Sequence, residues 1–425
     1  MTKASILQPG PAPAAAKDRT PGDSFLGTVD LMGLDGLFSA GEKDLALQVR
    51  GFVDEVIRPN IAEWYGQAVF PREVIPELGR LGLLGMHLDG YGCAGRSAVE
   101  WGLAAQELEA GDSGLRTFVS VQGSLAMTAI HKHGSEEQKK EWLPAMAAGE
   151  AVGCFALTEP YAGSDAAAMS TFARQEPGGD WVLNGVKRWI GSATLADVAI
   201  IWAQTGDAGD GRGVRGFVLP TNTPGFSAEV IDQKLSMRAS VQCEIRLQDV
   251  RLPAEAILPA DSAIGLKGPL QCLNEARYGI IWGVMGAARD SFSAVLGYAQ
   301  ERTQFGTPLA AFQLTQAKLA DMAVAINKGY LLSHQVGRVK DIMPGAVTPA
   351  MISAGKLDNC RVALDIARQA RALLGGNGIT LEHSPLRHAS NLESVRTYEG
   401  TDEIHQLTIG RTLTGFSAFT AGGAA

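Results

Sequence analysis

The chain has 425 residues, of which 46% are hydrophobic and 19% are charged, and its formal net charge is −8. This composition is typical of a globular protein with a large core, and the acidic balance without a basic block argues against nucleic acids and membrane surfaces as partners. Five scattered cysteines indicate reduced thiols inside a cell, the histidines lack metal-ligand spacing, and no apolar run is long enough to span a bilayer.

The N-terminal part of the chain has the periodicity of helices. Residues 1–38 are expected to form an arm and a lead-in, and residues 1–22 lack the apolar stretch of a secretory signal. From Ser39, which with Glu42 has the spacing of a helix N-terminus, apolar residues recur every three or four positions. A Gly-rich loop at residues 90–95 and the sequence Asp112-Ser113-Gly114 interrupt this pattern. We predict an all-helical domain over residues 39–149.

The middle of the chain changes to short β-prone runs. They lie at residues 152–157, 181–183, 198–203, 216–219 and 244–247, and Gly, Asp, Asn and Pro separate them. The dipeptide Asn184-Gly185 is typical of a two-residue hairpin turn. These features predict a small antiparallel β domain, a barrel or a sandwich, over residues 150–262.

After Pro269 the helical pattern returns. Long helices are expected at residues 273–300, from Pro308 to 341, and at 350–374, with a last one from Asn391 onward that is broken around Gly400. Helices of this length with short links predict a four-helix bundle over residues 263–419, followed by a tail at 420–425. The fold class is therefore α+β multidomain, in the order helical domain, β domain, helical bundle.

One acid near the end of the bundle stands out. Residues 396–404 read RTYEGTDEI, so Glu399 lies between an aromatic ring and a glycine on what we expect to be a short non-helical link between two helices. An acid in a loop is most often simply solvated. Residue type alone therefore assigns Glu399 no role.

Three other stretches could carry chemistry, although each is ordinary alone. Residues 154–165 (CFALTEPYAGSD) form a strand that opens into a loop of hydroxyl groups and backbone N–H donors, which suits a polar planar ligand. Residues 188–192 (RWIGS) place an indole ring beside a glycine. Residues 302–306 (RTQFG), Gln313 and residues 374–378 (LGGNG) combine an arginine with a Gly-rich turn, which suits a pyrophosphate.

Together, and in this order, these four motifs resemble the acyl-CoA dehydrogenase family over about residues 30–419. The resemblance implies FAD between the β domain and the bundle, with Glu399 as the base that removes the substrate α-proton. It also implies a homotetramer that passes electrons to electron transfer flavoprotein, in the cytoplasm of a bacterium, which we favour, or in the mitochondrial matrix of a eukaryote.

The family resemblance also implies which positions hold FAD. The isoalloxazine ring would contact Phe155, Leu157, Thr158, Gly163, Ser164, Trp189, Ile190 and Gly191. The adenine and pyrophosphate would contact Arg302, Phe305, Gln313, Leu374, Gly375 and Gly376, in this family partly from a neighbouring subunit, and Thr401 and Glu403 complete the set. The chain departs from the family at Gly191, where most relatives have a threonine near flavin N5.

A subset of motifs points to the acyl group. Residues 107–116, 273–283 and 397–399 resemble glutaryl-CoA dehydrogenase, which implies that Arg116 binds the distal carboxylate of the substrate with Thr117 and Ser120. A buried carboxylate needs a fixed cation, and arginine offers two parallel donors. The alternative is that Arg116 forms a structural salt bridge with Glu109. The remaining substrate contacts are expected at Glu109, Ser164, Asn274, Arg277, Tyr278, Tyr398, Gly400 and Phe419.

The resemblance implies FAD-dependent oxidation of glutaryl-CoA and decarboxylation to crotonyl-CoA and CO₂. The sequence leaves three alternatives open: a glutaryl-CoA dehydrogenase that does not decarboxylate, an acyl-CoA dehydrogenase for a monocarboxylic substrate, and a catalytically silent flavin-binding protein. Arg116 argues against a monocarboxylic substrate, whereas Gly191 mildly favours a silent protein.

Overall fold

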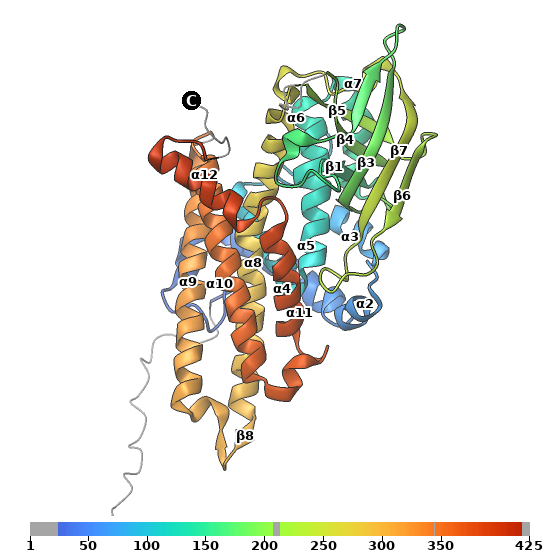
Figure 1. Ribbon diagram of the computed structural model, residues 1–425. Helices are drawn as coiled ribbons and strands as arrows, with labels where there is room; N and C mark the ends of the chain where they lie inside the picture. Colours follow the sequence, from blue (N-terminus) through green and yellow to red (C-terminus); the bar gives the residue numbers. More distant parts are fainter. Residues whose placement is uncertain (1–23, 207–212, 344, 419–425) are drawn as a thin grey trace, which may run out of the picture.

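A layer of helices separates a curled β-sheet from a bundle of long helices in this computed structural model (Figure 1). The structure describes residues 24–206, 213–343 and 345–418. Most of the N-terminal arm, Phe419 and the tail at 420–425 lie outside these residues. The order helical domain, β domain, helical bundle confirms the predicted fold class. No helix in the described part of the chain is both long and apolar enough to cross a membrane.

The N-terminal layer consists of seven α-helices and two π-helical segments among the described residues. The α-helices are α1 (Ala40–Phe52), α2 (Ile61–Gln67), α3 (Ile75–Arg80), α4 (Ala98–Gly111), α5 (Ser113–Val119), α6 (Thr128–His133) and α7 (Glu136–Ala148), and the π-helical segments are η2 (Val53–Ile57) and η4 (Ser120–Met127). Capping boxes begin α1, α4 and α7, at Ser39, Ser97 and Ser135. The expected break at Asp112 is the N-cap of α5.

The β domain is a seven-stranded sheet with the strand order β1-β4-β2-β3-β7-β6, in which β5 pairs with β4. Its strands are β1 (Gly153–Ala156), β2 (Phe172–Gln175), β3 (Trp181–Gly191), β4 (Val198–Gln204), β5 (Val214–Pro220), β6 (Phe226–Val230) and β7 (Gln242–Leu252). Most pairs are antiparallel as predicted, but β1 and β2 both pair with β4 in parallel, with Phe155 of β1 opposite Ile200.

The hairpin predicted at Asn184-Gly185 is wrong. Both residues lie inside β3, at a register irregularity in its pairing with β7. The Asn184 side chain bonds Asp249 on β7, and a Cβ atom at Gly185 would lie 2.4 Å from Thr171 Oγ1. The glycine therefore permits the close approach of another backbone rather than a turn.

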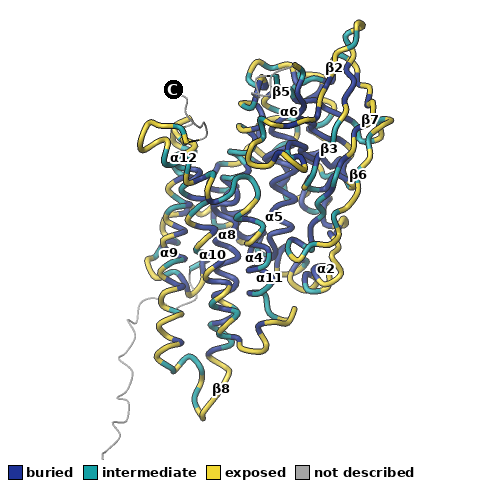
Figure 2. The backbone as a smooth tube through the Cα atoms, in the orientation of Figure 1, coloured by how far each residue is buried: buried dark blue, intermediate teal, exposed yellow. Residues whose placement is uncertain are grey.

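The C-terminal bundle is built from α8 (Lys267–Glu301), α9 (Gln313–Ile342), α10 (Pro349–Leu373) and α11 (Ser384–Thr397), followed by α12 (Asp402–Thr414). A short hairpin of β8 (Thr303–Gln304) and β9 (Thr307–Pro308) joins α8 to α9 at the far end of the bundle (Figure 1). Buried residues concentrate on α4, α5 and α8 and inside the sheet, whereas α9 has an exposed outer face (Figure 2).

Helices α4 and α8 cross at close range because glycines face large neighbours. A Cβ atom at Gly102 would lie 2.4 Å from the Trp282 ring, and one at Gly286 would lie 1.8 Å from the Gln106 carbonyl oxygen. This contact brings the helical layer against the bundle. It also places the end of α4 and the start of α5 beside the α11–α12 link described next.

Candidate active site

Glu399 lies on the link between α11, which ends at Thr397, and α12, which begins at Asp402. The prediction of a short non-helical link is therefore confirmed. The backbone φ angles are 55° at Glu399 and 102° at Gly400, both in the left-handed region, which a residue with a Cβ atom adopts at a cost. A Cβ atom at Gly400 would also lie 2.9 Å from His405 Nε2, so this position requires glycine.

One oxygen of the Glu399 carboxylate, Oε2, is buried without a direct partner among the described residues. Burial raises the pKa of Glu399, and the cations of Arg116, Lys356 and Arg277 oppose that rise. The group has the character of a proton acceptor, because a carboxylate paired to a cation would bind a proton much more weakly.

Arg116 on α5 is fully buried and connects the helical layer to this link. Its Nε atom donates to Glu109 Oε2 at 2.6 Å, and its Nη2 atom donates to the Tyr398 hydroxyl at 2.7 Å. The Thr117 hydroxyl lies 3.1 Å from the same Tyr398 oxygen. The salt bridge with Glu109 weighed above is thus present, yet Arg116 Nη1 has no partner among the described residues and remains available for another acceptor.

Helix α8 makes room for the Arg116 ion pair. A Cβ atom at Gly283 would lie 2.2 Å from Glu109 Oε2 and 3.1 Å from Arg116 Nε. Ser120, four residues after Arg116, is also buried, and its hydroxyl has no partner among the described residues. A buried arginine donor and a buried hydroxyl, both unpaired, indicate an acceptor that the chain itself does not supply.

Of the three residues predicted on α8, Arg277 contacts the link, Asn274 bonds Arg277, and Tyr278 packs elsewhere. Arg277 donates from Nε to the Glu399 carbonyl oxygen at 2.6 Å and from Nη1 to Asn274 Oδ1 at 3.2 Å. The Tyr278 hydroxyl instead donates to the Ala98 carbonyl oxygen at 2.6 Å, and its ring is fully buried. The substrate contact expected of Tyr278 therefore has no geometric support, because its side chain packs in the core.

The β domain presents a flat aromatic surface at the end of β3. Trp189 is 53% exposed at a φ of 64°, and the Arg188 guanidinium lies 5.2 Å from its ring centre. Ile190 beside it is buried, and a Cβ atom at Gly191 would lie 3.2 Å from Val121 of η4. An exposed indole beside a residue without a side chain fits a planar ring system.

The loop after β1 is positioned by residues that the sequence reasoning missed. Gly163 and Ser164 are exposed on it, whereas Phe155 and Leu157 are buried, and Phe155 packs 5.9 Å from Trp202, between ring centres. The Thr158 carbonyl oxygen accepts a hydrogen bond from the Arg188 backbone N–H at 2.9 Å, which joins the loop to β3. Any contact of Phe155 with a ligand would therefore come from its backbone.

Glu159 anchors this loop. It accepts hydrogen bonds from Lys187 Nζ at 2.8 Å, from the Ser170 N–H at 2.6 Å and from the Thr171 N–H at 2.9 Å. The ammonium of Lys187 and these donors hold the pKa of Glu159 at about 2 despite burial, and burial lowers the pKa of Lys187 to about 8. The sequence signal for this anchor is the acid itself, which lies between Thr158 and Pro160 in the motif.

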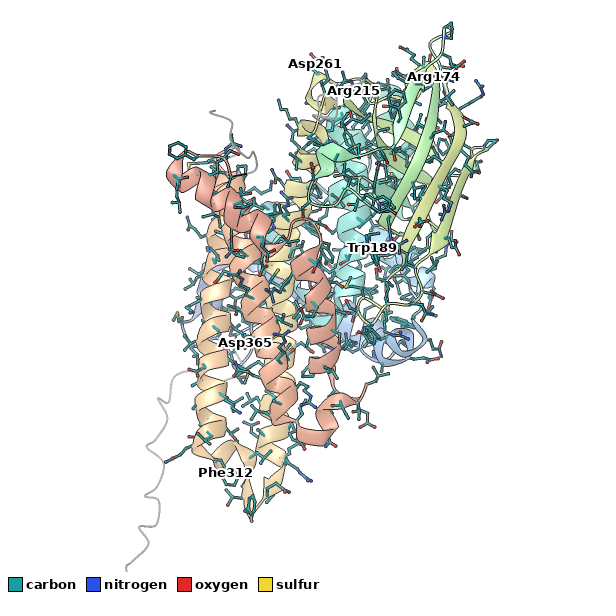
Figure 3. All side chains as sticks on the ribbon, viewed as in Figure 1. Arg174, Trp189, Arg215, Asp261, Phe312 and Asp365 are labelled. Carbon is teal, nitrogen blue, oxygen red and sulfur yellow. The ribbon has the colours of Figure 1, made fainter. Side chains whose placement is uncertain are left out.

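The residues expected at the adenine end lie elsewhere in the chain. Arg302, Phe305 and Gln313 are exposed on and beside the β8–β9 hairpin, and no carboxylate pairs with Arg302 among the described residues. Leu374 is buried, and Gly375 and Gly376, which have open space at Cβ, follow α10. Figure 3 shows Phe312 beside this hairpin, far from Trp189. One chain therefore does not bring the two expected halves of the FAD site together.

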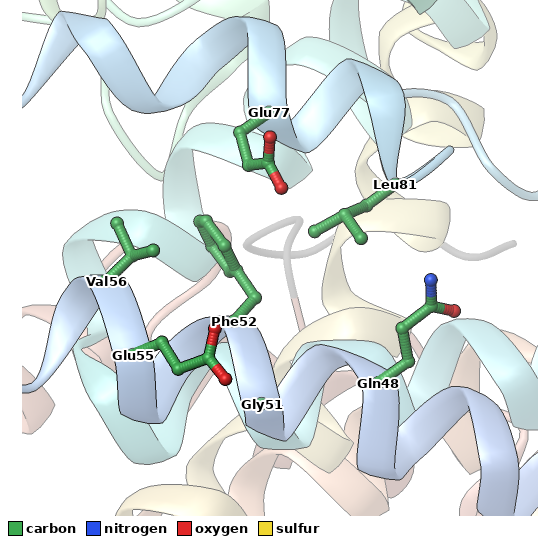
Figure 4. Close-up of a pocket in the computed structure, with 7 residues that line it drawn as sticks. All are labelled: Gln48, Gly51, Phe52, Glu55, Val56, Glu77 and Leu81. Atoms are coloured by element: carbon green, nitrogen blue, oxygen red, sulfur yellow. The ribbon is translucent and has the colours of Figure 1, made fainter.

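The remaining expected positions lie on α12 or beyond it. The Thr401 hydroxyl caps α12 by accepting a hydrogen bond from the Ile404 N–H at 3.4 Å, and Glu403 is exposed in the first turn. Phe419 is outside the described residues. The pocket in Figure 4 lies between α1 and the region of α3, where Phe52, Val56 and Leu81 line it, and it contains none of the expected site residues.

Comparison with known proteins agrees with this geometry. Residues 39–150, 154–250 and 264–414 match the N-terminal, middle and C-terminal domains of acyl-CoA dehydrogenases. The human mitochondrial short-chain specific acyl-CoA dehydrogenase is 36% identical over 361 residues, which are 85% of this chain and 87% of that protein.

Two solved structures are similar over most of their length. A glutaryl-CoA dehydrogenase from Mycobacterium smegmatis in complex with FADH2 is 56% identical, with a TM-score of 0.89 over 93% of this chain and all (100%) of the other. A glutaryl-CoA dehydrogenase in complex with glutaryl-CoA is 31% identical, with a TM-score of 0.85 over 89% and 96%. The chain belongs to the acyl-CoA dehydrogenase family.

Proposed function

We propose that the protein oxidises glutaryl-CoA with FAD and decarboxylates the product to crotonyl-CoA and CO₂. The observation that carries the choice of substrate is Arg116, a fully buried guanidinium that bonds the residue next to Glu399 and has one donor without a partner among residues 24–206, 213–343 and 345–418. A short apolar acyl chain needs no such donor, whereas a carboxylate at the far end of the chain needs one.

The residues present fit FAD. Trp189, Gly191 and the loop of Gly163 and Ser164 provide an exposed planar surface, and Arg302 with the Gly375–Gly376 turn provides an unpaired cation and open backbone for a pyrophosphate. When bound, FAD supplies the acceptor for a hydride from the substrate β-carbon. Because the two sets lie apart in one chain, we propose that a neighbouring copy supplies the adenine contacts, as a homotetramer would.

Glu399 is proposed to remove the α-proton of the acyl thioester. Its unpartnered oxygen and raised pKa give it the basicity that this step requires near neutral pH. The left-handed backbone at Glu399 and Gly400 fixes where the side chain leaves the link. Contacts elsewhere in the fold offset the free energy cost of this strained backbone geometry.

Arg116 is proposed to bind the distal carboxylate through Nη1, together with the hydroxyl groups of Thr117 and Ser120. Once the α,β double bond has formed, this carboxylate is attached to the γ-carbon, which is adjacent to a double bond conjugated with the thioester carbonyl. Breaking the carbon–carboxylate bond releases CO₂ and leaves its electron pair in a dienolate on the substrate. Protonated Glu399 then returns the proton and gives crotonyl-CoA.

A second function is favoured by two observations. Arg116 already forms an ion pair with Glu109, and the human relative is specific for short acyl chains. Both would fit a monocarboxylic acyl-CoA, for which Arg116 would be structural. A glutaryl-CoA dehydrogenase without decarboxylation and a silent flavin protein complete the alternatives. Electron transfer flavoprotein is the proposed electron acceptor in each active case.

One experiment separates these functions: product analysis after incubation of the holoenzyme with glutaryl-CoA and an artificial electron acceptor. Crotonyl-CoA with equimolar CO₂ is the expected result. Glutaconyl-CoA would show oxidation without decarboxylation. Absence of any product, together with turnover of butyryl-CoA, would contradict the proposal in favour of a monocarboxylic substrate.

A further inference from the structure

Two cations hold the backbone of the α11–α12 link. Arg277 Nε of α8 donates to the carbonyl oxygen of Glu399 at 2.6 Å, and Lys356 Nζ of α10 donates to the carbonyl oxygen of Gly400 at 2.7 Å. The two carbonyls are consecutive, and both residues have positive φ angles. Hydrogen bonds from a charged donor are stronger than neutral ones, so these contacts stabilise a backbone conformation that Glu399 disfavours.

Lys356 is an unusual lysine. It is 1% exposed, and no carboxylate pairs with it among the described residues. A buried ammonium without a carboxylate is costly and is rarely present without a function. Burial lowers the pKa of Lys356, and the Cys360 thiol and the Glu399 carboxylate oppose that shift. The ammonium therefore lies within the electrostatic range of Glu399 but bonds its neighbour's carbonyl instead of its carboxylate.

We propose that Lys356 is a positioning residue for Glu399. Its ammonium holds the Gly400 carbonyl group in place, and its positive charge stabilises the ionised Glu399 carboxylate without bonding to it. This inference rests on the proposed role of Glu399 as the base. A cation bonded directly to the carboxylate would block proton transfer, whereas one anchored to the backbone leaves the carboxylate oxygen free.

Other charged groups around Glu399 do not replace Lys356. Arg116 of α5 faces it, but Glu109 of α4 pairs with that guanidinium. Arg277 of α8 is the other cation without a carboxylate partner among the described residues, and it belongs to the expected substrate set. The remaining neighbours are Tyr398 on the link, Cys360 on α10, and His405 and Asp402 on α12, of which Asp402 is paired with Arg361 and Arg396.

The test compares three substitutions of Lys356 in the holoenzyme. Lys356→Met removes both the charge and the donor, Lys356→Gln keeps a donor without the charge, and Lys356→Arg keeps both. Arg361→Met is the matched control, because Arg361 lies on the same helix and bonds Asp402 at the other end of the link. The measurement is the pH profile of kcat/KM with butyryl-CoA and glutaryl-CoA, with kcat and KM resolved.

We expect Lys356→Met and Lys356→Gln to raise the apparent pKa of the catalytic base by about one unit, because a nearby cation has been lost. We expect kcat to fall by about tenfold or more in Lys356→Met, with a smaller change in KM, because a misplaced base loses rate before it loses binding. Lys356→Arg and Arg361→Met should keep the wild-type profile.

A second readout does not depend on turnover. The thermal midpoint of the holoenzyme is measured against pH with and without Glu399→Gln, in the wild-type and Lys356→Gln backgrounds. The pH at which Glu399→Gln begins to change the thermal midpoint reports the ionisation of Glu399. Lys356→Gln should shift this pH to a higher value.

Wild-type pH profiles in Lys356→Met and Lys356→Gln would overturn the proposal. If Lys356→Met does not fold, the comparison of Lys356→Gln with Lys356→Arg gives the same decision. Failure of the base assignment is recognised separately, because Glu399→Gln would then reduce its flavin with substrate at the normal rate whatever Lys356 does.

Discussion

Two regions of the molecule surround a glutamate carboxylate with opposite environments: one pairs it with cations, and the other leaves one of its buried oxygens without a partner among the described residues. Glu107, near the C-terminal end of α4, accepts two hydrogen bonds from Arg289, at 2.7 and 2.6 Å, and two from Arg50, at 2.9 and 3.0 Å. These two guanidinium groups hold the pKa of Glu107 at about 2 despite burial. Glu399, on the α11–α12 link, has an oxygen without a hydrogen-bond partner in the described part of the chain, and burial raises its pKa.

The difference shows how this fold separates stability from reactivity. Both carboxylates bear a desolvation cost, but only Glu107 has its charge neutralised by direct contact. Around Glu399 the cations bond the backbone or a neighbouring hydroxyl, as Arg277 and Arg116 do. The charge of Glu107 is thus neutralised by its partners, whereas Glu399 remains able to accept a proton.

The largest expected effect comes from Glu399→Gln, which removes the unsaturated carboxylate. Flavin reduction by glutaryl-CoA should fall by about 10⁴-fold, the upper end of what general base catalysis contributes, and stability should not decrease because no direct contact is lost. Anaerobic stopped-flow bleaching of the flavin measures the rate. Glu393→Gln, at an exposed acid on α11, is the control and should react normally.

The reverse result is expected for Glu107→Gln. Two buried guanidinium groups would lose their counter-charge, and removal of one partner of a buried ion pair costs about 3–5 kcal/mol. The thermal midpoint should fall, while the folded holoenzyme keeps its kcat. A normal midpoint would show that the Glu107 network does not contribute to stability, and a selective loss of kcat would place it in the site.

Much of this contrast could be predicted from the sequence, but not all of it. The glycine after Glu399 and the order of the four motifs located the link. Lys356 was missed because a lysine four residues after Ile352 and four before Cys360 looks like an interruption of an apolar face. Its partner is a backbone carbonyl 44 residues away in the chain. Because every residue has a backbone carbonyl, residue types alone cannot identify this acceptor.

Local patterns failed where tertiary contacts decided the structure. Asn184-Gly185 has the composition of a turn, yet Thr171 packs against the glycine inside a long strand. Strands β2 and β6 were not predicted, because they are short and largely exposed and so lack an apolar run. Tyr278 was assigned to the substrate from its motif, although a helix turns neighbouring side chains by about 100° and only Arg277 faces the link.

A smaller effect is expected from Gly283→Ala, which disturbs Arg116 without removing it. The added Cβ atom would lie 2.2 Å from Glu109 Oε2, and overpacking of this kind costs about 1–3 kcal/mol. The KM for glutaryl-CoA should rise more than the KM for butyryl-CoA. Gly297→Ala on the same helix has open space at Cβ and should change neither constant.

The smallest effects concern pH. Glu107 has a folded pKa of about 2 against an ordinary value of 4.5, so its contribution to stability is present above pH 4.5 and is lost as the pH falls toward 2. Glu399 has a raised folded pKa, so its contribution is full below pH 4.5 and is lost as the pH rises through the folded pKa. Because a neutral glutamine resembles a protonated glutamate, Glu107→Gln should have a lower thermal midpoint than wild type above pH 4.5, whereas Glu399→Gln should have a higher one as the pH rises through the folded pKa of Glu399.

The role of Arg116 is tested most directly by one ratio: the rate of flavin reduction by glutaryl-CoA divided by that by butyryl-CoA, in wild type and in Arg116→Ala. Because both rates come from one preparation, any loss of folded enzyme cancels. Arg289→Ala, which removes another buried guanidinium, is the matched control.

We predict that Arg116→Ala lowers the ratio by about 100-fold, since loss of a charged partner in a buried contact costs ~3 kcal/mol, and that Arg289→Ala leaves it unchanged. An unchanged ratio in Arg116→Ala would contradict the account, because the guanidinium would then serve only its ion pair with Glu109.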